Sequence, residues 1–440
     1  MASCLLPLDG ARIRPVTATD THRAIDAVWR IEAPRLIAGL ARILRDVGLA
    51  EELAQDALVI ALERWPAAGI PDNPGAWLMA TAKHRAIDRL RHRKLAEQKH
   101  AEIGREIDAA QDPVAALEDA LDDDIGDDLL RLVFTACHPV LATEARVALT
   151  LRLLCGLTTD EIARAFLAPE PTVAQRIVRA KRALKDAGVP FEVPRGPDRA
   201  GRLTSVLEVI YLVFNEGYTA TAGEDWTRPA LCQEALRLGR VLAGLAPEEA
   251  EVHGLVALLE IQASRLGARA GPSGEPVLLL DQDRARWDRL LIRRGLAALT
   301  RAEALGDPGP YTLQAAIAAC HVRAPSGAET NWPRIAALYA ALATIAPSPI
   351  VELNRAVALS MAFGPAVGLE VVDALAGEPA LQAYHLLPSV RGDFLMKLGR
   401  RGEARAEFER AASLTQNARE RALLLERAAK CGDGPGAKTI

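Results

Sequence analysis

Residues 157–186, LTTDEIARAFLAPEPTVAQRIVRAKRALKD, read as two helices joined by a tight turn. Thr158 and Glu161 have the spacing of a capping box, in which each side chain satisfies a backbone amide at the start of a helix. Pro169 stops that first helix. Pro171 suits the first turn of the next helix, because the N–H that it lacks would have no partner there. The stretch therefore predicts a helix, a turn and a second helix in quick succession.

The second helix has two sharply different faces. At about 100° per residue, its apolar side chains fall within about 60° of one another; they are Val173, Ile177, Ala180 and Leu184. The opposite side carries Gln175, Arg179 and Arg182. One face is therefore expected to dock on the preceding helix while the other points outward.

Arg and Gln suit bidentate contacts to guanine and adenine edges in a major groove. Three further basic residues on this helix suit phosphate contacts; they are Arg176, Lys181 and Lys185. This layout is typical of a helix-turn-helix. An ordinary αα-hairpin with a basic solvent face is the alternative.

A different basic segment lies between Lys83 and Lys99, where seven Lys and Arg residues outnumber two acids. We expect a helix over 78–94 with an apolar stripe of Ala80, Ile87 and Leu90 and a basic row of Arg85, Arg89 and Arg93. The loop before it carries Asn73 and Trp77. A basic row beside such a loop suits single-stranded DNA, since cations follow phosphates and a loop pocket holds an unstacked base. The alternative for Trp77 is a core position at the helix start.

The composition favours an all-α protein. Hydrophobic residues make up 50% of the 440 and aromatic residues only 4%, which argues against a β-sandwich or barrel. No apolar run is long enough for a transmembrane helix, and the N-terminus lacks the features of a signal peptide, so we expect a cytoplasmic protein without a membrane partner. The net charge is −4, but the basic segments flank an acidic stretch, 118–128, with seven acids and no base.

No cofactor, metal site or catalytic residue is expected. The six cysteines lie far apart and form no C-x-x-C pair. His84, His92 and His100 are spaced by about 12 Å of helical rise, too far apart to share a metal. No nucleophile–base pair or phosphate-binding glycine loop stands out, so the chain is not expected to be an enzyme.

Two stretches together resemble bacterial extracytoplasmic-function (ECF) sigma factors. Residues 53–65, LAQDALVIALERW, followed by 74–91, PGAWLMATAKHRAIDRLR, resemble region two of that family. Residues 157–184 resemble region four, in the same order and at a matching separation. The family resemblance implies a protein that binds the RNA polymerase core, opens the minus-ten element and reads the minus-thirty-five element.

The resemblance also implies roles for particular residues. Contact with the polymerase clamp is implied for Glu51, Glu52, Gln55 and Asp56. Contact with single-stranded minus-ten DNA is implied for Asn73, Trp77, Lys83, Arg85, Arg89 and Arg91. Contact with double-stranded minus-thirty-five DNA is implied for Thr172, Gln175, Arg176, Arg179 and Arg182. Region four would also touch the polymerase flap.

The remaining residues exceed what a compact sigma factor needs. Residues 398–411, LGRRGEARAEFERA, resemble the turn and second helix of a tetratricopeptide repeat (TPR), and 362–369 aligns with them 35 residues earlier. A solenoid of such repeats would offer a concave surface to a protein or small-molecule regulator. The run 281–288, DQDRARWD, resembles a signature of the ECF group that carries such an extension. Its charged residues and tryptophan form either an intramolecular dock or a capped helix start with the tryptophan buried; they are Asp281, Asp283, Arg284, Arg286, Trp287 and Asp288.

The expected organisation is a tail (1–20), region two (21–97), an acidic linker (98–126), region four (127–190), a helical extension (191–300) and TPR-like repeats (301–440). The resemblance suggests that the extension regulates the sigma domains. Two other functions stay open from the residues alone: a stand-alone helix-turn-helix regulator, and a TPR-type scaffold that binds only proteins.

Overall fold

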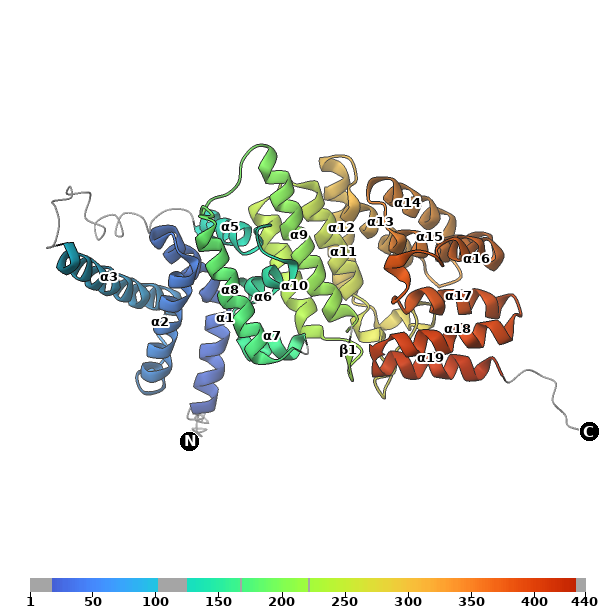
Figure 1. Cartoon of the computed structure of the whole chain (residues 1–440), viewed down its shortest axis with the longest axis horizontal. Helices are drawn as coiled ribbons and strands as arrows, with labels where there is room; N and C mark the ends of the chain where they lie inside the picture. The colour runs from blue at the N-terminus through green and yellow to red at the C-terminus, as the bar shows by residue number, and fades with distance from the viewer. Residues whose placement is uncertain (1–17, 102–124, 167, 221, 433–440) are drawn as a thin grey trace, which may run out of the picture. The chain divides into compact units, whose positions relative to one another are not determined.

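The computed structural model describes residues 18–101, 125–166, 168–220 and 222–432, apart from the side chains of 18–23, 90–101, 125–127, Arg164, Pro197 and 222–223. These residues fold almost entirely as helices (Figure 1), which confirms the all-α prediction. Extended pairing among them is limited to β1 (Ala222–Gly223), which lies parallel to β2 (Gln416–Asn417), and to an isolated antiparallel bridge between Ala270 and Pro276. None of their helices is long and apolar enough to cross a bilayer. Most of the predicted acidic linker, 102–124, lies outside the described residues.

The helices divide into two compact units. The first comprises residues up to Ala136 together with Leu151–Thr158 and Val178–Val193. It holds α1 (Ala18–Leu44), α2 (Val47–Ala68), α3 (Pro74–Ala101) and α5 (Ile125–Ala136), with the last turns of α6 (Thr143–Leu154) and α8 (Glu170–Asp186). Its core contains Leu40, Leu53, Trp65 and Leu78, each at most 2% exposed.

A buried carboxylate joins α5 to α1 in this unit. Asp128, in the last part of the acidic stretch, is 4% exposed and lies 2.8 Å from Arg42 on α1. Burial raises the pKa of Asp128, against the opposing effect of Arg42 and Arg131. The end of the acidic stretch is therefore part of a packed helix and not of a connector.

The apolar stripe predicted on α3 is partly wrong. Ala80 is exposed and Ile87 is half-buried, whereas the buried residues are Leu78, Ala82 and Ala86. The buried positions follow an i, i+4 spacing, and their face is set by the packing of α3 on α1 and α2.

The second unit comprises Cys137–Thr150, Thr159–Ile177 and the chain from Pro194 onward. After α7 (Thr159–Ala165), most of its helices follow one another along the chain, and each packs on the next (Figure 1). They are α9 (Pro197–Tyr218), α10 (Pro229–Leu245), α11 (Ala250–Ala263), α12 (Arg289–Leu305), α13 (Pro310–Arg323), α14 (Trp332–Ile345), α15 (Pro349–Phe363), α16 (Pro365–Ala374), α17 (Leu386–Lys397), α18 (Arg401–Leu414) and α19 (Ala418–Lys430). Single 3₁₀ turns occur at Leu266–Ala268, Leu279–Asp281, Arg284–Arg286 and Pro379–Leu381.

The two glycines that mark the predicted repeat both end helices. Gly364 follows α15 with a φ of +103°, and Gly399 follows α17 with a φ of +77°. Glycine adopts such values without the steric cost that a Cβ brings. The turns agree with the 35-residue spacing, and the TPR assignment itself stays a prediction.

The loop after α9 is hydrogen-bonded to the residue that precedes α19. Asn417 is fully buried, and its side-chain amide donates to the carbonyl oxygens of Ala220 (3.1 Å) and Asp225 (2.9 Å). Its side-chain oxygen accepts from the backbone amides of Arg419 and Glu420, so the same residue caps α19. This contact brings together segments about 190 residues apart in sequence.

The run 281–288 combines both arrangements that were left open. Trp287 is 3% exposed, and Asp288 caps α12 by accepting from the backbone amides of Leu290 and Leu291. Asp283 caps the short turn before it in the same way. Arg284 docks on the end of α13, where it donates to the carbonyl oxygens of His321 (2.5 Å) and Ala324 (2.9 Å).

The other two charged residues of this run point to different surroundings. Arg286 donates to the carbonyl oxygen of Gly267, and Asp281 is exposed. Asp283 and Asp288 therefore bind backbone amides and the two arginines bind backbone carbonyls, so the expected dock forms without ion pairs inside the run.

His321, on α13, predicts an acid-sensitive extension. Burial, together with the nearby Arg265 and Arg284, lowers the pKa of His321 to about 4. The unfolded chain takes up this proton near pH 6.5, so the stabilisation is complete above that pH and declines as the pH falls towards 4. Between pH 7.5 and 5.5, the free energy of unfolding should fall by about 1 kcal/mol more in the wild type than in His321→Phe. Urea denaturation of both proteins at the two pH values measures this difference. An equal fall in the free energy of unfolding in the two proteins would refute the prediction.

Candidate nucleic-acid interface

The helix α8 has the two faces expected of a recognition helix. Val173, Ile177, Ala180 and Leu184 are between 1% and 5% exposed, so the predicted apolar face is confirmed. The outer face is open to solvent, with Thr172, Gln175, Arg179 and Arg182 all exposed. Three long polar side chains and one hydroxyl group are thus available on one side of a helix that is anchored on the other.

Part of this basic helix is engaged within the protein. Lys181 forms an ion pair with Glu51 of α2, and Lys185 Nζ lies 2.9 Å from Asp46 Oδ2 at the cap of α2. Arg182 lies 3.3 Å from Asp186 on its own helix, and both side chains are exposed. The two lysines that were expected to meet phosphates therefore bind carboxylates in this arrangement.

Glu51 is the centre of that contact. It is 2% exposed, and Arg152 of α6 approaches it at 2.7 Å from a second direction. The Gln55 side chain also donates to it. A buried carboxylate needs such partners, because removing one of them leaves an uncompensated charge. The family resemblance implies a polymerase contact for Glu51, which stays a prediction, and the sequence gave no signal for Arg152.

Asp46 supports the same contact from the end of α2. Its side chain accepts from the amide of Leu49 (3.0 Å) as a helix cap. Burial alone would raise the pKa of Asp46, but the hydrogen bond from Lys185 and those from backbone amides hold it below the usual value. Asp46 is therefore a carboxylate at neutral pH, available to Lys185.

The other residues expected on the polymerase side are more accessible. Glu52 is exposed, and Gln55 and Asp56 are half-buried. Glu52 lies 3.2 Å from Arg89 of α3, and both side chains are more than half exposed. Such an exposed pair contributes little to stability, so both residues remain available to a partner.

The expected minus-ten residues lie at the start of α3 and along it. Asn73 caps the helix, since its side-chain oxygen accepts from the amide of Ala76 at 3.0 Å. Trp77 is half-buried and packs edge-on against the buried Trp65, with ring centroids 5.2 Å apart. Both residues therefore have a structural role in addition to any contact with DNA.

The basic row of α3 is open where its side chains are described. Arg85 and Arg89 are exposed and Lys83 is half-buried. The side chains of Arg91 and Arg93 lie outside the described residues. Along the described parts of the chain, no group of three His, Cys, Asp or Glu residues is placed to hold a metal ion.

Comparison with known families shows what the segments that contain α3 and α8 are similar to. Residues 29–95 match the family model of sigma-70 region 2, and residues 131–184 match that of sigma-70 region 4. SigK of Mycobacterium tuberculosis strain H37Rv, an ECF RNA polymerase sigma factor, is 34% identical over 150 residues, which cover 75% of SigK and 33% of this chain. The chain belongs to the family of ECF sigma factors. This family consists of non-enzymatic transcription initiation factors, which agrees with the prediction that the chain is not an enzyme.

Two further matches extend the comparison of this sigma factor. SigK of Mycobacterium sp. strain KMS is 31% identical over 179 residues, or 87% of that protein and 40% of this one. The uncharacterized protein R00370 of Rhizobium meliloti strain 1021 is 44% identical over 402 residues, 94% of that protein and 91% of this one. Residues 202–303 match a family of unknown function, DUF6596. No solved structure matches the chain.

Proposed function

We propose that this sigma factor reads the minus-thirty-five element with α8 and the minus-ten element with α3, while α2 binds the clamp of RNA polymerase. Regions 2 and 4 of sigma-70 imply the polymerase core and promoter DNA as partners. The observation that carries the proposal is the exposed row Gln175, Arg179 and Arg182 on a helix whose opposite face is buried. These side chains have the donors and the spacing for base edges in a major groove.

In the arrangement described above, α8 is held on α2. The contact uses Glu51, which the family resemblance assigns to the polymerase side, and Lys181, which is basic and faces α2. The two promoter elements are roughly 50–60 Å apart along a duplex, so a protein that reads both must extend. We therefore take this arrangement as the closed form of the free protein. Initiation would require α8 to separate from α2.

The extension would act through the helix-turn-helix. In the second unit, Arg146 of α6 lies 3.0 Å from Glu208 of α9 and also donates to the side chain of Ser205. The Ser205 hydroxyl in turn donates to the carbonyl oxygen of Cys137 at 2.6 Å. Arg228 donates to the carbonyl oxygen of Ala165 at the end of α7. Truncation at Pro194 would remove all these contacts at once, so single substitutions give the cleaner test.

Arg146→Ala tests this regulation. The change removes the contacts to Ser205 and Glu208, and promoter-specific transcription by the purified polymerase complex should change. The matched control is Arg391→Ala, because Arg391 likewise joins neighbouring helices through its guanidinium, which binds the carboxylates of Asp373 and Glu407 among the last helices of the chain. Equal transcription by the Arg146 variant and the wild type would count against regulation through this contact.

A further inference from the structure

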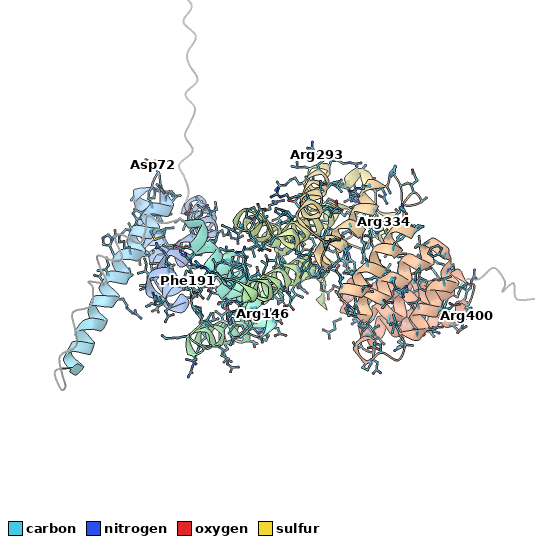
Figure 2. The ribbon with its side chains drawn as sticks, turned by 90° about the horizontal axis from the view of Figure 1, so that it is seen from above. Asp72, Arg146, Phe191, Arg293, Arg334 and Arg400 are labelled. Atoms are coloured by element: carbon cyan, nitrogen blue, oxygen red, sulfur yellow. The ribbon has the colours of Figure 1, made fainter. Side chains whose placement is uncertain are left out.

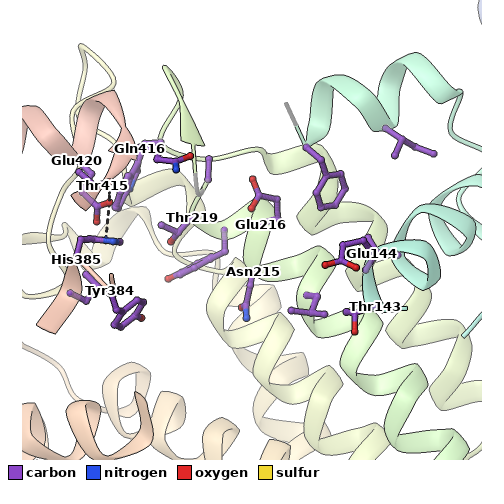
Figure 3. A pocket seen from close by; sticks show the side chains of 18 of the residues that line it. Thr143, Glu144, Asn215, Glu216, Thr219, Tyr384, His385, Thr415, Gln416 and Glu420 are labelled. Carbon is purple, nitrogen blue, oxygen red and sulfur yellow. Dashed lines mark hydrogen bonds and ion pairs between the residues drawn. The ribbon is translucent and has the colours of Figure 1, made fainter. Parts of the chain in front are cut away.

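The second unit contains a cavity of about 950 Å³. Its walls come from α6, α7 and α8, from α9 and the loop after it, and from the residues around the starts of α17 and α19 (Figure 3). The size is that of a site for a small organic molecule. Most of the lining is apolar or aromatic, including Phe166, Trp226, Tyr384 and Leu414.

One wall of the cavity has a guanidinium group directly behind it. The Arg269 Cζ lies 3.7 Å from the ring centroid of Tyr218 and 5.4 Å from that of Trp226, and both rings line the cavity. Arg269 Nη2 donates to Thr219 Oγ1 at 2.7 Å. The Thr219 hydroxyl therefore keeps its own hydrogen for another acceptor. The buried indole N–H of Trp226 has no acceptor among the described residues, so this wall offers donors.

The positive charge continues behind that wall. Guanidinium groups and aromatic rings alternate from Trp226 through Arg269, Tyr218, Arg265 and Trp287 to Arg284, with each guanidinium within 6.0 Å of the next ring centroid. Ring faces favour such cations. The series connects the cavity wall with the run 281–288.

No carboxylate in the described parts of the chain forms an ion pair with these three arginines. Arg265 donates to the side chain of Gln262, and Arg284 donates to two backbone carbonyls. Burial lowers the pKa of Arg269 and of Arg284, and Arg265 adds to both effects, while Tyr218 opposes the shift of Arg269 and Glu329 opposes that of Arg284. Positive charge that is partly buried without a counter-ion is costly, and an anion at the wall would lower that cost.

The acids that line the cavity have partners of their own or are exposed to solvent. Glu216 forms an ion pair with Arg228. Glu420 lies 2.9 Å from His385 and accepts from Thr415 at 2.7 Å (Figure 3). Glu144 is exposed, where water screens its charge.

On the α8 side, Arg176 lines the cavity, is half-buried and forms no ion pair with the described residues. Together with the Arg269 wall, it makes the cavity favourable for a negative charge.

We propose that the cavity binds a small organic acid with a flat apolar body. The acid group would lie at the wall formed by Tyr218, Thr219 and Trp226, and the body between the aromatic and aliphatic side chains. Because Val173 and Arg176 belong to α8, the bound acid would touch the helix assigned to promoter reading. The binding itself does not rest on that assignment.

The test uses two fluorescent probes and the full-length protein. 8-Anilinonaphthalene-1-sulfonate is a flat aromatic anion, and N-phenyl-1-naphthylamine has the same rings without the charge. The anionic probe should bind with a stoichiometry of one and at least about tenfold more tightly than the neutral probe. Arg269→Gln and, separately, Arg176→Gln should each weaken the anionic probe about tenfold and leave the neutral probe unchanged.

The matched control is Arg293→Gln, since Arg293 is an exposed α12 residue at the surface of the second unit (Figure 2). It should bind both probes as the wild type does. Arg176 lies on a helix whose outer face is solvent-exposed, so its variant keeps the test informative if Arg269→Gln misfolds by circular dichroism. The proposal is overturned if both probes bind alike, or if a folded Arg269 or Arg176 variant binds the anionic probe as tightly as Arg293→Gln. None of these outcomes depends on polymerase, so transcription assays test the sigma function separately.

Discussion

Oxidation of a Gly48→Cys/Lys181→Cys double variant should stop promoter-dependent transcription. A Cβ atom built on Gly48 would lie 3.8 Å from the Cβ of Lys181. Disulfides typically join Cβ atoms about 3.5–4.5 Å apart, so a bridge can form without moving the backbone. The bridge would hold α8 on α2 and prevent the release that we propose for initiation. Run-off transcription should fall at least about tenfold, and a reductant should restore it.

The two single cysteine variants are the controls. Neither can form the bridge, and each shows the effect of its own substitution on transcription. Each should transcribe equally with and without oxidant. Full activity of the oxidised double variant, with the bridge verified by mass spectrometry, would show that α8 and α2 do not separate during initiation. That result would leave the assignment as a sigma factor unchanged and would rule out the proposed closed form.

Replacing two outward side chains of α8 should have the second large effect. Gln175 and Arg179 are exposed and lie one turn apart on the face opposite the buried residues. A good bidentate contact to a base is worth about 1–3 kcal/mol, so Gln175→Ala/Arg179→Ala should reduce transcription about tenfold or more from a promoter selected by the wild-type complex.

Binding of polymerase core by this variant should be unchanged, and gel filtration of the mixture measures it. Arg293→Ala provides the control for loss of an exposed arginine elsewhere. Wild-type transcription by the α8 variant would mean that this face does not read DNA, as expected for a hairpin with a merely solvated basic face.

Local periodicity predicted a large part of this molecule. The apolar positions Val173, Ile177, Ala180 and Leu184 follow directly from helical spacing, and all four are buried. Helix breakers were equally informative, since Gly364 and Gly399 both end helices. Such features depend on residues within a few turns of one another, which the sequence displays directly.

Contacts between distant segments could not be predicted from local periodicity. Nothing near Glu51 indicates that Arg152 and Lys181 would meet its carboxylate, 101 residues and more further along the chain. Asn417 shows no local sign that it holds the loop at Ala220. Ala80 was misplaced for a related reason, because its exposure depends on where α1 and α2 pack and not on the sequence of α3 alone.

Promoter-dependent run-off transcription with purified polymerase core tests the sigma assignment most directly. The full-length protein should co-elute with the core and direct transcripts from a defined start site that neither component produces alone. A chain that fails to associate with the core, and adds no start site at any concentration, would contradict the assignment of both basic surfaces.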